Sequence, residues 1–77
     1  MVIPLVEMRR NQSGIVVELQ GGKSMVARLN SMGLRPGVQV TKKTGQPLHG
    51  PVTFRYGGTE LALGHEIARK VLVEAQE

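Results

Sequence analysis

The chain has 77 residues, with ten lysines and arginines, six glutamates, no cysteine and a formal net charge of +4. This length allows one domain with a small core, and we expect a single domain over residues 1–77. The absence of cysteine excludes disulfides, thiolate metal sites and a cysteine nucleophile. Because small secreted domains usually need disulfides, we expect a cytoplasmic location. The first ten residues fit neither a signal peptide nor a membrane span, so we expect no direct membrane insertion.

The first half of the chain predicts a strand and then a helix. Residues 14–20 alternate between apolar and polar, which is typical of a half-buried strand. Its predicted inward side chains are Ile15, Val17 and Leu19. Residues 23–32 have helical spacing, and Gly33 follows where a left-handed residue ends many helices. The apolar helix face consists of Met25, Leu29 and Met32. We expect core packing for both methionines, whereas an exposed methionine here would favour a partner groove.

The second half predicts four more strands. Pro36 and Gly37 fit the centre of a type II turn, because proline presets φ and glycine accepts a positive φ. Alternating apolar residues between turn residues place the strands at 38–44, 52–56, 59–63 and 71–74. The connecting segments are a loop at 45–51, a two-glycine hairpin turn at 57–58 and a helical turn within 64–70.

Together these elements predict a fold that is mainly β, with one short helix and a helical turn before the last strand. About five short antiparallel strands joined by tight turns favour closure into a small β-barrel, because closure removes sheet edges.

No catalytic motif is complete in the sequence. Gly22-Lys23-Ser24 is similar to the end of a phosphate-binding loop, but position 17, where that loop requires glycine, is valine. None of the serines has both flanking glycines of a nucleophile elbow. We therefore expect a protein that binds another protein and is not an enzyme.

The weak candidates for metal ligands are His49, His65 and Glu66. Two histidines and a carboxylate suit ferrous iron, but adjacent residues on a helix diverge, and the spacing does not support a site. We expect no cofactor beyond a weakly or adventitiously bound divalent metal. Phe54 and Tyr56 are the only aromatic residues, which is too few for base stacking, so we do not expect nucleic acid as a partner.

The order and spacing of several short motifs resemble FeoA, the small cytoplasmic accessory protein of bacterial ferrous-iron uptake. The resemblance extends from Pro4 to about Val73. The motifs that carry it are PLVEM at 4–8, SGIV at 13–16, GG at 21–22, RL at 28–29, MGLRPGVQV at 32–40, Pro47, GP at 50–51 and LAL at 61–63.

The resemblance implies an SH3-like β-barrel and a partner, the membrane ferrous-iron transporter FeoB with its cytosolic GTPase domain. A related barrel occurs in iron-dependent repressors of the DtxR type, so a metal-responsive regulatory module is one alternative. An RNA- or ribosome-associated small barrel is another, which only the positive charge favours. Three residues depart from the family pattern: Asn11 stands where glycine is frequent, His49 where a small residue is usual, and Gly64 where arginine is common.

The outer strand faces and the loops supply the candidate residues for partner binding. These are Arg35, Lys42, Lys43, His49 and Arg55. A domain of this size would bury about 800 Å² or less on a partner, which predicts a transient complex. The sequence leaves a weak homo-oligomer open.

Overall fold

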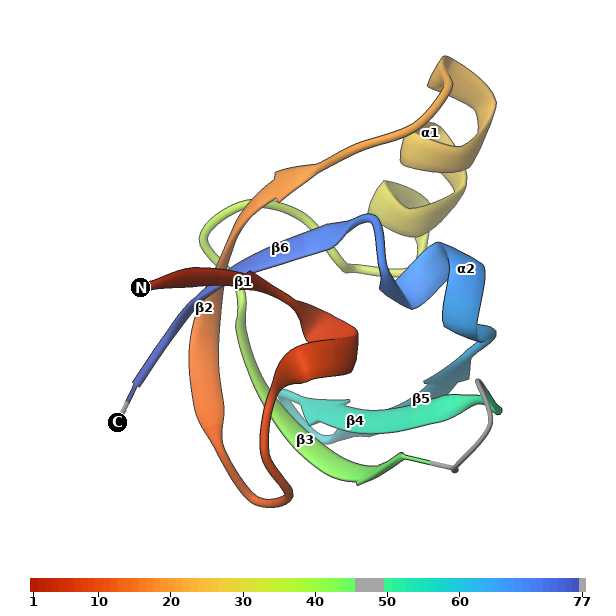
Figure 1. The fold of residues 1–77 in the computed structure, drawn as a ribbon. Coiled ribbons are helices and arrows are strands. Elements are labelled where there is room, and N and C mark those ends of the chain that lie inside the picture. Colours follow the sequence, from red (N-terminus) through yellow and green to blue (C-terminus); the bar gives the residue numbers. More distant parts are fainter. Residues whose placement is uncertain (46–49, 77) are drawn as a thin grey trace.

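The sheet of this protein joins strands from both ends of the chain. The computed structural model describes residues 1–45 and 50–76, and there six antiparallel strands form one sheet in the order β1-β6-β2-β3-β4-β5. The strands are β1 (Val2–Pro4), β2 (Ser13–Leu19), β3 (Gln39–Gly45), β4 (Val52–Tyr56), β5 (Thr59–Leu63) and β6 (Val71–Ala75). The helical elements are a 3-10 helix, η1 (Leu5–Glu7), and two α-helices, α1 (Lys23–Ser31) and α2 (His65–Ala68) (Figure 1).

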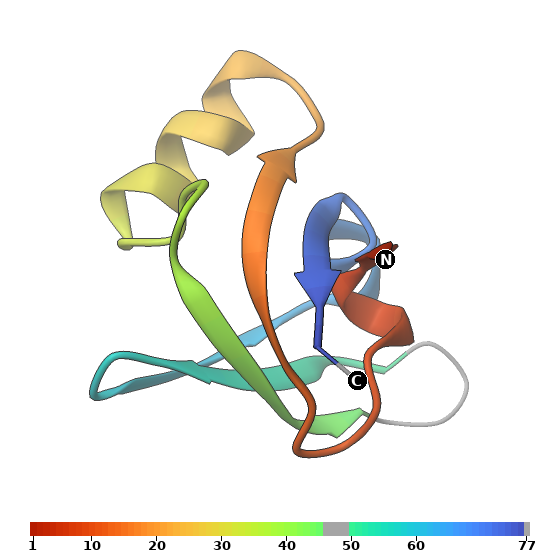
Figure 2. The same ribbon diagram turned by 90° about the vertical axis from the view of Figure 1, so that its left-hand side faces the viewer.

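The sheet curls around one core. In Figure 2, β2 and β3 run side by side, and the hairpin of β4 and β5 crosses at their lower ends. The predicted mainly β fold, its helix and the helical turn before the last strand are confirmed. The predicted count of strands was one too low, because it missed β1. That strand has three residues and pairs with β6, with Val2 opposite Glu74, so no local pattern marks it.

The core lies inside the curl of the sheet. Its largest fully buried side chains come from η1, the loop after α1 and four of the strands: Leu5, Val16, Leu34, Val40, Phe54, Val71 and Val73. Leu29 of α1, which is 2% exposed, Leu63 of β5 and Ala68 of α2 also belong to the core, and Ile3 of β1 packs against it. The core is therefore assembled mainly from contacts between distant parts of the chain.

The end of α1 has the backbone that its glycine predicts. Gly33 has a φ of 91°. Its N–H donates to the carbonyl of Asn30 at 2.9 Å, and the N–H of Leu34 donates to the carbonyl of Leu29 at 3.0 Å. This pair of hydrogen bonds is a Schellman motif, with Leu29 and Leu34 both buried beside it.

Two further turn residues have a positive φ, and the first confirms a predicted turn. Gly37 has a φ of 97°, and the N–H of Val38 donates to the carbonyl of Arg35 at 3.1 Å, which closes the expected turn. Asn11 has a φ of 67°, so asparagine occupies the left-handed region where the family frequently has glycine.

The predicted inward face of β2 was wrong. Val16 is 1% exposed, whereas Val17 is 42% exposed and Ile15 and Leu19 are only half-buried. The register with β6 shifts between Val16 and Glu18, so Val17 is the extra residue of a β-bulge. Three consecutive apolar residues fit either face of a strand, and pairing with β6 selects the face.

Among the described residues, no helix combines the length and apolar character that crossing a membrane requires.

Candidate interaction surfaces

Lys42 lies inside the molecule, so its predicted place on an outer strand face was wrong. The residue is 8% exposed. Its Nζ donates hydrogen bonds to the carbonyls of Val6 at 2.9 Å and Met8 at 2.7 Å, which ties η1 to β3. Burial lowers the pKa of Lys42 below its usual value. The signal was present in the sequence, because Val40 and Lys42 are two residues apart on one strand and share a face.

Three of the other predicted partner-binding residues lie in the part of the chain that the structure describes, on different elements. Lys43 is half-buried, and Arg55 forms an exposed ion pair with Glu60 at 3.3 Å. Arg35 is exposed in the turn between α1 and β3. His49 lies outside the described residues. Partner binding by these residues stays a prediction.

His65 and Glu66 begin the short helix α2. A hydrogen bond from Arg69 at 2.8 Å, together with the charge of that guanidinium, lowers the pKa of Glu66. Within residues 1–45 and 50–76, no three histidine or acidic side chains are grouped so that they could hold a metal ion. The third candidate ligand, His49, lies outside this part of the chain.

A mainly apolar groove separates α1 from the end of β5 and the start of α2. Its lining residues are Ser24, Met25, Arg28, Leu29, Met32, Ala62, Leu63, Gly64 and Ile67. Met25 and Met32 pack against the core, as predicted, but each remains half-buried and exposes part of its side chain to the groove. Figure 1 shows α1 standing off the barrel above α2. The helix therefore serves as one wall of the groove.

Two contacts hold the α1 wall in place. Leu29 anchors the helix in the core, and the hydroxyl of Tyr56 donates to the carbonyl of Met32 at 2.6 Å. On the opposite side, Gly64 is exposed, and a Cβ added there would meet no atom within 4 Å. The departure from arginine at position 64 thus leaves this side of the groove open.

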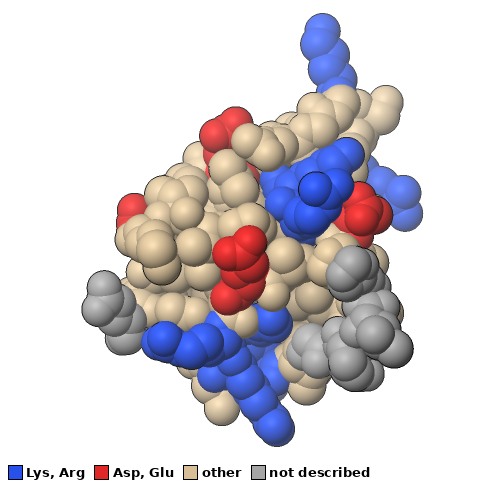
Figure 3. All heavy atoms as spheres, viewed as in Figure 1, with Lys and Arg blue, Asp and Glu red and all other residues tan. Residues whose placement is uncertain are grey.

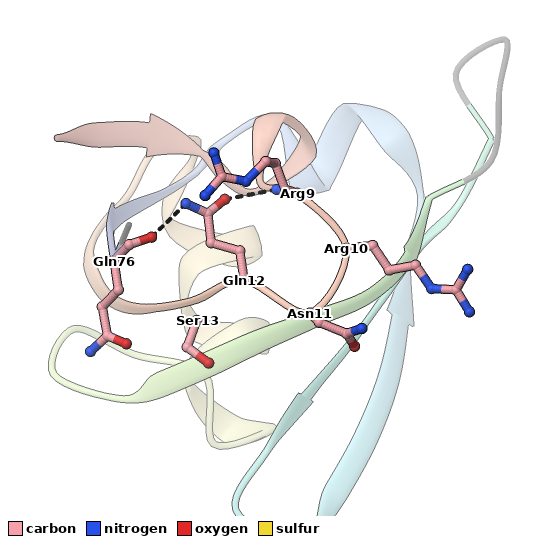
Figure 4. Close-up of a pocket in the computed structure, with 6 residues that line it drawn as sticks. All are labelled: Arg9, Arg10, Asn11, Gln12, Ser13 and Gln76. Atoms are coloured by element: carbon pink, nitrogen blue, oxygen red, sulfur yellow. Dashed lines mark hydrogen bonds between the residues drawn. The ribbon is translucent and has the colours of Figure 1, made fainter.

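A second hollow is polar and lies at the turn between η1 and β2. Its lining residues are Arg9, Arg10, Asn11, Gln12, Ser13 and Gln76 (Figure 4). The adjacent arginines are visible in the sequence as a charge pair, but no local pattern places them on a hollow with Gln76. The β2–β6 pairing brings these distant segments together.

Comparison with known proteins identifies the family. The FeoA domain model matches residues 3–75. The chain belongs to the FeoA family. A Methanocaldococcus jannaschii protein with the name Putative Fe(2+) transport protein A is 31% identical over 74 residues, which cover 96% of this chain and 88% of that protein. The FeoA family is thus linked to ferrous iron transport.

Solved structures agree with the assignment of this FeoA protein. The crystal structure of an iron uptake regulatory protein, FeoA, is 38% identical, covers 99% of this chain and 100% of its own, and has a TM-score of 0.90. A manganese-dependent transcriptional repressor has a TM-score of 0.88 at 16% identity, over 97% of this chain and 42% of the repressor. The second likeness shows a shared fold alone. The SH3-like barrel is therefore confirmed. The alternative of a metal-responsive regulatory module is supported only by the shared fold.

Proposed function

We propose that this FeoA protein is a non-enzymatic, cytoplasmic accessory protein that binds and modulates a FeoB-like ferrous-iron transporter. The family match over residues 3–75 carries the proposal, since it links the whole domain to ferrous iron transport. A small domain of this kind acts by contact, and its partner would be the cytosolic GTPase domain of the transporter.

The groove between α1 and α2 is the surface that we expect to contact the transporter. Met25 and Met32 are half-buried on one wall, and methionine side chains adapt to the shape of a partner. Ala62, on the opposite side, is exposed and small. An apolar segment of the transporter could bury these side chains with little loss of existing contacts.

Calorimetric titration against the purified GTPase domain of the transporter tests the proposal. Ala62→Glu places a charge in the groove and should weaken binding at least tenfold, because a carboxylate would be desolvated against apolar surface. Ala27→Glu is the matched control, since Ala27 is exposed on α1 and does not line the groove. It should retain wild-type affinity.

The functional measurement is ferrous-iron uptake in cells whose own FeoA gene has been deleted and which express the wild type or a variant. Wild type and Ala27→Glu should restore uptake, and Ala62→Glu should restore less. Absence of wild-type binding together with absence of any effect on uptake would overturn the proposed function. If Ala62→Glu and Ala27→Glu lost binding and uptake to the same extent, the groove would not be the contact surface.

A further inference from the structure

The hollow at the η1–β2 turn is fixed by internal hydrogen bonds. The N–H of Gln12 donates to the carbonyl of Arg9 at 3.0 Å. The backbone N–H of Asn11 donates to the carbonyl of Lys42 at 2.7 Å, and the N–H of Lys42 donates to the carbonyl of Gln12 at 3.0 Å. Behind the turn, the buried ammonium of Lys42 holds the carbonyl of Met8. The turn is therefore held in one shape before any partner arrives.

The side-chain oxygens of Gln12 and Asn11 are already occupied by hydrogen bonds within the protein. The side-chain oxygen of Gln12 accepts from the backbone N–H of Arg9 at 2.7 Å, and its amide nitrogen donates to the carbonyl of Gln76 at 2.6 Å (Figure 4). The side-chain oxygen of Asn11 accepts from Nζ of Lys43 at 3.4 Å. Within the described part of the chain, the guanidinium groups of Arg9 and Arg10 have no hydrogen-bond acceptor. A complementary surface must therefore supply hydrogen-bond acceptors.

The positive charge at this turn is not neutralised within the described residues. The ion pairs found in residues 1–45 and 50–76 join the N-terminal amine to Glu74, Arg55 to Glu60, and Arg69 to Glu66. Arg9, Arg10 and Lys43 belong to none of them. Figure 3 shows lysine and arginine side chains gathered at the lower end of the molecule, where this turn lies in Figure 1. The complementary surface must therefore be anionic as well.

The direction of the two arginines selects among anions. In Figure 4 the side chain of Arg9 and that of Arg10 point to opposite sides of the turn. The two guanidinium groups do not converge on one point, so a single phosphate could not bind both of them. Several negative charges spaced along a chain would fit this arrangement.

The neighbourhood of the turn argues against nucleic acid and lipid. Phe54 is fully buried, so no cluster of aromatic side chains is available for base stacking. The exposed large apolar side chains in the described residues are Met1, Val2 and Val17, and none belongs to the turn. The turn thus lacks an apolar anchor for a bilayer.

We propose that the basic turn, defined as Arg9, Arg10 and Lys43 around Asn11, binds an extended acidic segment of a partner protein. The segment would place carboxylates on both sides of the turn and bind weakly, with strong dependence on salt. This inference rests on the proposed function only in naming the transporter as the protein that carries the segment.

Fluorescence anisotropy with a labelled octaglutamate peptide tests the basic turn at low and high ionic strength. The double variant Arg9→Gln with Arg10→Gln should weaken binding about three- to tenfold, as expected for two exposed ion pairs. The turn should keep its shape, because its hydrogen bonds use the backbone of Arg9. Lys23→Gln with Arg69→Gln is the matched control, since it removes two exposed positive charges elsewhere and should bind like wild type.

Equal weakening in both double variants would overturn the proposal, because binding would then follow net charge. It would also be overturned if single-stranded RNA or phosphatidylglycerol vesicles bound wild type more tightly than the peptide through the same two arginines.

Titration with the GTPase domain separates this inference from the proposed function. Selective loss of binding in the Arg9 and Arg10 variant supports both. If that variant binds the GTPase domain like wild type but loses the peptide, the basic turn is not the transporter contact, and the proposed function still stands. If wild type does not bind the domain, the proposed function fails, and the peptide titration still decides whether the turn takes an acidic segment.

Discussion

The role of a single residue in this protein depends more on its surroundings than on its amino-acid type. Lys42 and Lys43 are neighbours in the sequence, with the same charge. Lys42 is 8% exposed and bonded to two carbonyls, whereas Lys43 is half-buried and lies where the β3–β4 register shifts between Lys42 and Thr44. Pairing with β4 and contact with η1 thus give Lys42 a structural role and leave Lys43 available to a partner.

Substitutions at this lysine pair should therefore have unequal effects. Lys42→Met removes two hydrogen bonds to carbonyls and should lower the free energy of unfolding by about 1–3 kcal/mol. Lys42→Glu should cost more, because it places a carboxylate against the same carbonyl oxygens. Lys43→Glu should stay within about 0.5 kcal/mol of wild type. Urea unfolding followed by circular dichroism measures all three, and equal effects at the two positions would contradict the assigned roles.

Gly14 is a residue whose size matters. A Cβ at this position would lie 2.4 Å from Cγ1 of Val73 and 2.7 Å from the backbone oxygen of Glu74. Gly14→Ala should therefore lower the free energy of unfolding by about 1–3 kcal/mol, because β6 would have to move. The control is Gly64→Ser, where an added Cβ would meet no atom within 4 Å and serine is a favourable N-cap for α2. A thermal melt that shows no loss for Gly14→Ala would mean that β2 and β6 can separate freely.

Among the elements, α1 buries a single residue, Leu29, in the core. Met25 and Met32 pack against the core but stay half-buried along the groove. The helix can therefore form a binding wall and still be fixed at its centre.

Truncating this anchor tests how α1 is attached. Leu29→Ala should lower the free energy of unfolding by about 2–5 kcal/mol. Asn30→Ala, on the exposed side of the helix, should be neutral or slightly stabilising, since alanine is the better helix former. Chemical denaturation compares the two variants. A near-neutral Leu29→Ala would show that the helix is held by its ends, through Gly22 and the Gly33 cap.

For the whole molecule, the pairing of the two chain ends is the most distant contact in the sequence. Ile3 in β1 lies opposite Val73 in β6 and packs against the core. Contacts between the chain ends close the longest loop, so their entropic cost is highest before the rest of the sheet forms.

The contribution of β1 should therefore appear late in folding. Ile3→Ala should lower stability by about 1–2 kcal/mol, mostly through faster unfolding, with refolding nearly unchanged. Stopped-flow refolding and unfolding in denaturant measure both rates. A refolding rate that falls in proportion to the lost stability would place β1 in the folding nucleus instead.

The sequence by itself determined the elements that depend on near neighbours. Alternation marked β3, β4 and β5, the spacing of Met25 and Leu29 marked α1, and Gly33 and Gly37 marked the turns, because backbone conformation and side-chain period are local properties. The order of its motifs also sufficed to identify the family.

Only the tertiary structure decided which face of a strand is inward and which side chains meet. Pairing with β6 places Val16 inside and makes Val17 the bulge residue on the surface. The carbonyls of Val6 and Met8 accept hydrogen bonds from Lys42 and fix its side chain inside the molecule. Packing of α1 beside β5 and α2 created the groove, and the β2–β6 pairing brought Gln76 to the basic turn. Each of these outcomes depends on groups that are distant in the chain and become neighbours only when the sheet closes, so no local pattern contains them.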